Sequence, residues 1–114
     1  MHDIQAEMRF LSLSAQKVRL VIDLVRGKSA NDALEILRLV NKRSASPVRK
    51  LVASAVADAE ENFGVSRDDL YVHKIFADEA PTRKWRRFGA RGRFKPILRR
   101  NSHVTIVLRE RGAE

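Results

Sequence analysis

The chain has 114 residues, 44% of them hydrophobic, which suffices for one small domain over residues 1–114. It contains no cysteine, which excludes disulfides and thiolate metal sites. The formal net charge is +9, a balance typical of proteins that bind nucleic acid. No apolar run approaches the ~18 residues of a membrane span, and we expect no signal peptide because no basic leader precedes an apolar stretch.

The first two predicted elements are a strand and a helix. Residues 3–11 alternate apolar with polar side chains and predict a half-buried strand, whose inner face would carry Ile4, Ala6, Met8 and Phe10. A helix should begin after Ser12 or Ser14 and stop at Gly27. Its apolar residues recur at helical spacing: Val18, Val21, Ile22 and Val25.

Two further helices are predicted next. One should begin with Ser29 as its cap and end near Asn41, with an apolar stripe of Ala33, Leu34, Leu37 and Val40. The other should be capped by Ser46, carry Pro47 at its first position and end at Phe63 and Gly64. Its buried stripe would be Val48, Leu51, Val52, Ala55, Val56 and Ala59.

Residues 69–77 and 102–109 are rich in strand-forming side chains and should pair antiparallel. Residues 80–101 between them would then form a hairpin arm that reaches ~30 Å from the sheet. The predicted order is β-α-α-α-β-β. It indicates an α+β fold in which three helices pack on a small three-stranded antiparallel sheet that carries a long basic β-hairpin arm.

The whole net charge comes from residues 83–100, which hold nine Arg or Lys and no acid. Arg binds phosphate through paired N–H groups, and aromatic rings stack on unpaired bases. Trp85, Phe88 and Phe94 lie within this basic segment, so RNA is the first interpretation. The alternatives are a solvated basic loop and, for Gly89 and Gly92, a phosphate-binding loop instead of the turn at the tip.

Secondary basic positions lie on the predicted helices and, for Lys42 and Arg43, in the loop before the third helix. They are either RNA contacts or ordinary charged helix faces, and they comprise Lys17, Arg19, Arg26, Lys42, Arg43, Arg49 and Lys50.

No group of residues in the sequence predicts catalysis, a metal site or a cofactor site. His73 and His103 would come close if the last two strands pair, but no carboxylate or Cys stands at ligand spacing. Asp68 and Asp69 should lie at the entry to a strand, and Asp78 and Glu79 should pair with the basic arm. Neighbouring strand residues point to opposite faces, so neither acidic pair converges on a substrate. We therefore expect a protein that is not an enzyme.

Three segments together resemble a known family. They read LSLSAQKVRLVIDLVRGKS, DALEILRLVNKRSASPVRKLVASAVADAEEN and DDLYVHKIFADEAPTRKWRRFGARGRFKPILRRNSHVTIVL. In order and length they resemble the ribosomal large-subunit protein twenty-two family of the bacterial type. Leu13-Ser14-Ala15-Gln16-Lys17-Val18-Arg19 stands where that family reads Met-Ser-Pro-Arg-Lys-Val-Arg, and the Ala-Arg-Gly-Arg tip is shared. Phe88, Gly89 and Phe94 depart from the family's pattern.

The resemblance implies a structural rRNA-binding protein of the large ribosomal subunit, cytoplasmic and monomeric within the ribosome. Its globular part would lie near the exit of the peptide tunnel and its arm would line the tunnel, next to the nascent peptide and neighbouring ribosomal proteins. The tunnel-lining tip would be Phe88, Gly89, Ala90, Arg91, Gly92 and Arg93. The rRNA-binding residues would be Lys17, Arg19, Lys42, Arg43, Arg83, Lys84, Trp85, Arg86, Arg87, Arg91, Arg93, Lys95, Arg99, Arg100, Ser102 and His103.

A rival interpretation is a basic module that binds another RNA, a membrane surface or an acidic protein. Membrane binding would favour an amphipathic helix beside the basic segment. Pro81, Pro96 and the two glycines of the arm argue against such a helix.

Overall fold

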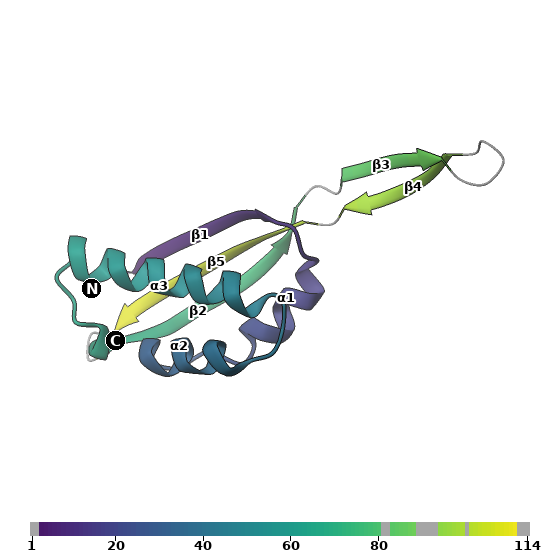
Figure 1. The fold of residues 1–114 in the computed structure, drawn as a ribbon. Coiled ribbons are helices and arrows are strands. Elements are labelled where there is room, and N and C mark those ends of the chain that lie inside the picture. The colour runs from purple at the N-terminus through teal and green to yellow at the C-terminus, as the bar shows by residue number, and fades with distance from the viewer. Residues whose placement is uncertain (1–2, 81–82, 89–93, 100, 112–114) are drawn as a thin grey trace.

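The computed structural model describes residues 3–80, 83–88, 94–99 and 101–111. For Phe10 and for the strands 83–88 and 94–99 the description covers the backbone alone. The elements follow one another as shown in Figure 1. They are β1 (Ile4–Leu11), α1 (Ala15–Ile22), α2 (Ala30–Leu39), α3 (Ala45–Asn62), the 3-10 turn η1 (Arg67–Asp69), β2 (Leu70–Glu79), β3 (Arg83–Phe88), β4 (Phe94–Arg99) and β5 (Ser102–Glu110). The predicted α+β fold is confirmed.

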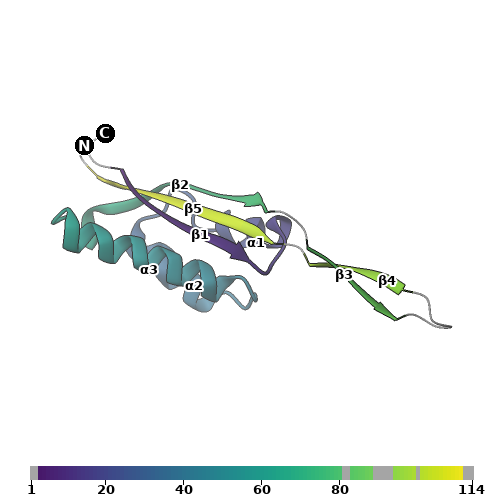
Figure 2. The ribbon, with the colours of Figure 1, turned by 90° about the horizontal axis from the view of Figure 1, so that it is seen from above.

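The body of the protein is a three-stranded antiparallel sheet in the order β1-β5-β2, with helices against one face (Figures 1 and 2). The last strand of the chain is therefore the central one. Every second side chain of this strand is fully buried under the helices: Val104, Ile106 and Leu108. In the register of the sheet Ile106 faces Ala6 on β1 and Ile75 on β2, so one layer of apolar side chains crosses all three strands.

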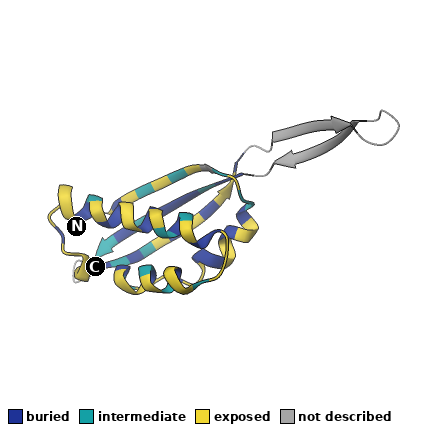
Figure 3. Cartoon of the chain, viewed as in Figure 1, coloured by how far each residue is buried: buried dark blue, intermediate teal, exposed yellow. Residues whose placement is uncertain are grey.

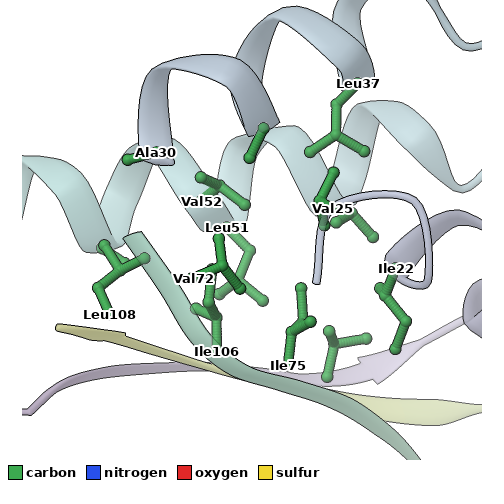
Figure 4. Close-up of a cluster of buried hydrophobic side chains, with 14 of the residues drawn as sticks. Ile22, Val25, Ala30, Leu37, Leu51, Val52, Val72, Ile75, Ile106 and Leu108 are labelled. Atoms are coloured by element: carbon green, nitrogen blue, oxygen red, sulfur yellow. The ribbon is translucent and has the colours of Figure 1, made fainter. Parts of the chain in front are cut away.

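The core lies between this layer and the helices. Figure 3 shows the buried positions on the facing sides of α3 and the sheet, and Figure 4 shows Leu51 and Val52 of α3 meeting Val72 and Ile106. Full burial of such a side chain contributes about 1.5–3 kcal/mol relative to exposure. The body therefore holds together chiefly through this one apolar cluster.

The third helix buries its predicted stripe, but it begins earlier than the sequence indicated. All six stripe residues are buried, and Phe63 and Gly64 close the helix as expected. The predicted cap at Ser46 is wrong, because the helix starts at Ala45 with Ser44 in the cap position. A turn from Lys42 O to Ala45 N precedes it. Pro47 is tolerated inside the first turn because the N–H groups there have no intrahelical partner.

The first helix is shorter than predicted. Ser14 is the cap, and its hydroxyl accepts a hydrogen bond from Lys17 N at 3.4 Å. The α-helix ends at Ile22, and tighter i to i−3 hydrogen bonds carry the chain on to Val25, which is fully buried. Gly27, with a φ of 78°, ends this turn rather than the helix itself.

The second helix begins as predicted. The Ser29 hydroxyl accepts from Asp32 N at 3.2 Å, and the helix ends at Leu39, two residues before the expected Asn41.

Candidate nucleic-acid interface

Two strands continue the β2–β5 hairpin beyond the sheet as the predicted arm. β3 and β4 pair antiparallel from Arg83↔Arg99 at the base to Phe88↔Phe94 at the far end. A backbone hydrogen bond from Ala80 N to Asn101 O, 3.0 Å long, closes the base. The molecule measures 64 × 25 × 21 Å, and its radius of gyration of 17.2 Å exceeds the roughly 13 Å of a compact chain of this length. The arm therefore extends the molecule away from the core (Figure 2).

The register of the arm places basic residues opposite one another. Arg83 pairs with Arg99, and Arg87 pairs with Lys95. Like charges at directly opposite positions destabilise an antiparallel pair. A polyanion that lies along the arm would remove this repulsion, so the arrangement favours a nucleic-acid partner over water alone.

The predicted arm contacts fall into two groups. On the described strands lie Arg83, Lys84, Trp85, Arg86, Arg87, Phe88, Lys95 and Arg99. Outside the described residues lie Gly89, Ala90, Arg91, Gly92, Arg93 and Arg100. The roles of both groups stay predictions.

The basic side chains of the body divide into paired and unpaired ones. Arginines that form ion pairs with an acid are Arg9, Arg26, Arg38, Arg67 and Arg109. By contrast, several side chains at the start of α1 and around the start of α3 form no ion pair within the described part of the chain: Lys17, Lys42, Arg43, Arg49 and Lys50. Figure 1 shows that these two helix starts lie at the end of the body that bears the arm. These five unpaired charges therefore lie on the side of the arm.

The opposite end of the body is acidic. The last turns of α3 and the η1 turn carry Asp58, Glu60, Glu61, Asp68 and Asp69. Arg67 is held there by Glu60 at 3.1 Å. Acids at the C-terminal end of a helix interact unfavourably with its macrodipole, and the first turn of α3 has no acid that would interact favourably with it. This distribution fits a body that turns its arm-bearing end toward a polyanion.

Arg19, a predicted rRNA contact, lies on α1 and bonds to the protein itself. Its Nε and Nη2 donate to the carbonyl oxygen of Ala77 on β2 at 3.1 and 2.8 Å. Arg26 makes a similar bond, from Nη2 to the oxygen of Ile75 at 2.7 Å. The sequence indicated that both arginines lie on one predicted helix, but it held no signal for the strand that they contact.

Ser102 and His103 begin the central strand at the base of the arm. Ser102 is fully buried, and its hydroxyl has no hydrogen-bond partner among the described residues. Its side chain therefore offers no surface to RNA in this structure, and its assignment stays a prediction. His103 is half-buried and lies opposite Asp78 in the register.

The histidines do not meet. His73 lies at the irregularity between Val72 and Lys74, near the partners of Leu108 and Val107, whereas His103 pairs with Asp78 at the other end of the strand. The expectation that strand pairing would bring them together is wrong, because the register separates them along β5. Within the described ranges no group of three or more ligating side chains could hold a metal ion. Among the same residues, no helix is long and apolar enough to cross a membrane.

The two acidic pairs lie at the two ends of β2. Asp68 and Asp69 lie at the entry to this strand, as expected, in a 3-10 turn capped by Ser66. Asp78 and Glu79 are exposed at the end of β2. Their predicted partners on the arm have side chains outside the described set, so this pairing stays a prediction.

The exposed ion pair between Asp3 and Arg109 shifts the pKa of both groups. Arg109 donates from Nε to Asp3 Oδ1 at 2.7 Å and from Nη2 to Asp3 Oδ2 at 3.1 Å. These hydrogen bonds lower the pKa of Asp3 and raise the pKa of Arg109. The pair fastens the start of β1 to the end of β5, away from the arm. Its role is structural.

Comparison with family models gives one match, to Ribosomal protein L22p/L17e over residues 6–109. The match runs from within β1 to the end of β5 and includes both arm strands. It covers the body, the unpaired basic end and the arm in one alignment, and this family consists of structural proteins rather than enzymes. The chain therefore belongs to the ribosomal protein L22p/L17e family and is an rRNA-binding component of the large ribosomal subunit, with rRNA and ribosomal proteins as its partners in the cytoplasm.

Proposed function

We propose that the arm, residues 80–101, penetrates the rRNA and lines the peptide exit tunnel, while the body lies near the tunnel exit and supports subunit assembly. The observation that carries this proposal is the shape and charge of the arm together. It is a two-stranded extension with basic residues paired across its strands, on a molecule 64 Å long. A partner with deep, negatively charged channels would match such an extension along its length.

The body supports the same orientation. Unpaired basic residues lie at the end of the body that bears the arm, and five acids of α3 and the η1 turn lie at the far end. Contacts from Lys17, Lys42 and Arg43 to phosphates would hold the body against the RNA surface while the arm enters it. The acidic end would then face away from the RNA.

Within the arm, the proposed roles follow position. Near the base and along the strands, the basic residues Arg83, Lys84, Arg86, Arg87, Lys95, Arg99 and Arg100 would bind phosphates, and Trp85 would stack on a base. The tip, residues 88–93, would lie nearest to the nascent peptide, with Arg91 and Arg93 binding RNA on either side. Ser102 and His103 would mark the limit of the contact at the base.

Site-specific photocrosslinking tests this proposal. A photoreactive amino acid replaces Arg91 in one strain and Ser54, an exposed residue on α3, in another. Ribosomes carrying a stalled nascent chain are then irradiated. We expect residue 91 to crosslink to large-subunit rRNA and to the nascent peptide, and residue 54 to crosslink to neither. Crosslinks from residue 91 to rRNA alone would show that the arm enters the RNA but does not line the tunnel.

A further inference from the structure

We propose that Arg19 is a positioning residue that sets the direction of the arm through its hydrogen bonds to β2 at the base of the arm. The inference rests on the proposed function, because the direction of the arm affects function only if the arm must enter the rRNA. It assigns Arg19 a role that acts through the protein backbone instead of a direct contact with phosphate.

The hydrogen bonds place Arg19 where the chain leaves the body. Both Nε and Nη2 of Arg19 donate to one acceptor, the Ala77 carbonyl oxygen, at 3.1 and 2.8 Å. Ala77 is buried, and three residues later Ala80 closes the base of the arm. Ala77 is also paired with Val104 of β5. The strand is therefore held from both sides just before it continues into the arm.

The position of β2 in the sheet explains why its carbonyl groups need hydrogen bonds from Arg19. β2 is an edge strand, so the carbonyl groups on its outer side have no strand partner. The α1 segment and the turn after it supply the missing partners. Gly27 N donates to Val72 O at 3.1 Å, Arg26 donates to Ile75 O at 2.7 Å, and Arg19 donates to Ala77 O. Arg19 is the last of this series in the direction of the arm.

The geometry demands arginine. Its planar guanidinium can direct two N–H groups at one oxygen, and a charged donor makes a stronger hydrogen bond than a neutral one. Lysine has a single nitrogen at the end of a flexible stem and cannot reproduce the two-point contact. Lys17, two residues away on the same helix, is exposed and forms no ion pair within the described part of the chain. The two residues carry equal charge but differ in what they touch.

A distance measurement in the free protein tests the positioning directly. The chain contains no cysteine, so Ser54→Cys on α3 and Arg87→Cys on β3 give two unique sites for spin labels. Pulsed electron spin resonance then reports the distribution of distances between body and arm. The parent is compared with Arg19→Gln, Arg19→Lys and Lys17→Gln in the same doubly labelled, full-length chain.

We expect Arg19→Gln to broaden the distance distribution, Arg19→Lys to broaden it to a lesser degree although the charge is kept, and Lys17→Gln to leave it unchanged. Thermal melting of each variant shows that the body remains folded. If Arg19→Gln lowers the melting temperature too far to interpret, Arg19→Lys decides the question. Distributions for both Arg19 variants that match the parent would overturn the proposal.

RNA binding separates positioning from direct contact. Arg19→Gln should weaken rRNA binding by about three- to tenfold, because a smaller fraction of molecules holds the arm in the binding direction, and the salt dependence should stay unchanged. Lys17→Gln should instead flatten the slope of log affinity against log salt by roughly 0.7. A slope that Arg19→Gln flattens equally and Arg19→Lys restores would make Arg19 a phosphate ligand and refute its positioning role. If the parent itself bound rRNA without salt dependence, the proposed function would fail, while the distance result would still stand.

Discussion

The body and the arm of this protein differ in apolar burial and in the pairing of their charges. The body buries an apolar layer between helices and sheet and pairs many of its arginines with acids. The arm has no acid in residues 83–100, and basic residues face one another across its two strands. From this comparison we expect the body to supply most of the stability and the arm to supply most of the RNA binding, so that each part can be changed with limited effect on the other.

The largest expected effect comes from removal of the arm. Replacement of residues 83–100 by a short Asn-Gly turn should weaken rRNA binding by orders of magnitude, because most phosphate contacts are lost. The melting temperature should stay nearly unchanged, since the apolar cluster of the body remains. Filter binding and a thermal melt measure the two quantities.

A matched control keeps the length of the arm. Its nine basic residues are replaced by Gln, and this variant should lose affinity to a similar degree. A fall in melting temperature after removal of the arm would show that the arm packs on the core, and the separation of the two parts would then be incorrect.

A change in the body should have the reverse effect. Ile106→Ala, at the centre of the buried layer, should lower the free energy of unfolding by about 2–5 kcal/mol, measured by urea denaturation. Val107→Ala is the control on the same strand, half-buried on the other face of the sheet, and should cost less than about 1.5 kcal/mol. The folded fraction of the Ile106→Ala protein should bind rRNA as tightly as the parent. Weaker binding by the folded protein would show that the core also shapes the interface.

A smaller effect should distinguish the two ends of the body. Lys42→Gln and Arg43→Gln, at the end that bears the arm, should each flatten the slope of log affinity against log salt by roughly 0.7–0.9, the value for one phosphate contact. Arg67→Gln is the control at the acidic end, where Glu60 already pairs with the arginine at 3.1 Å. It should leave the slope unchanged. Equal salt-dependence slopes for all three variants would mean that the body has no preferred orientation on the RNA.

The smallest effect concerns the ion pair between Asp3 and Arg109. Because the hydrogen bonds from Arg109 lower the folded-state pKa of Asp3 below 3.8, the pair stabilises the protein above the unfolded-state pKa. This contribution is lost as pH falls through the folded-state pKa. Asp3→Asn should therefore be slightly less stable than the parent at neutral pH and equally stable in strong acid, as followed by urea denaturation at several pH values.

The sequence by itself determined the fold class, the order of the elements and the basic arm. Periodicity was sufficient for this, because side chains alternate on a strand and recur every three to four residues on a helix. Val104, Ile106 and Leu108 on β5 and the stripe of α3 are buried as that periodicity indicates. Helix starts were less certain: Ser44, not Ser46, precedes α3, since a turn through Lys42 and Ala45 begins it early.

Only the tertiary structure decided which charged side chains are free to meet RNA. Arg19 and Lys17 share a helix and a charge, yet Arg19 donates to the Ala77 carbonyl while Lys17 remains exposed. Ser102, which the resemblance assigns to the interface, is buried at the base of the arm. The register likewise separates His73 from His103 along β5. Local sequence sets the face on which a side chain lies, but its partners come from strands and helices far away in the chain, and these meet only when the apolar layer has brought them together.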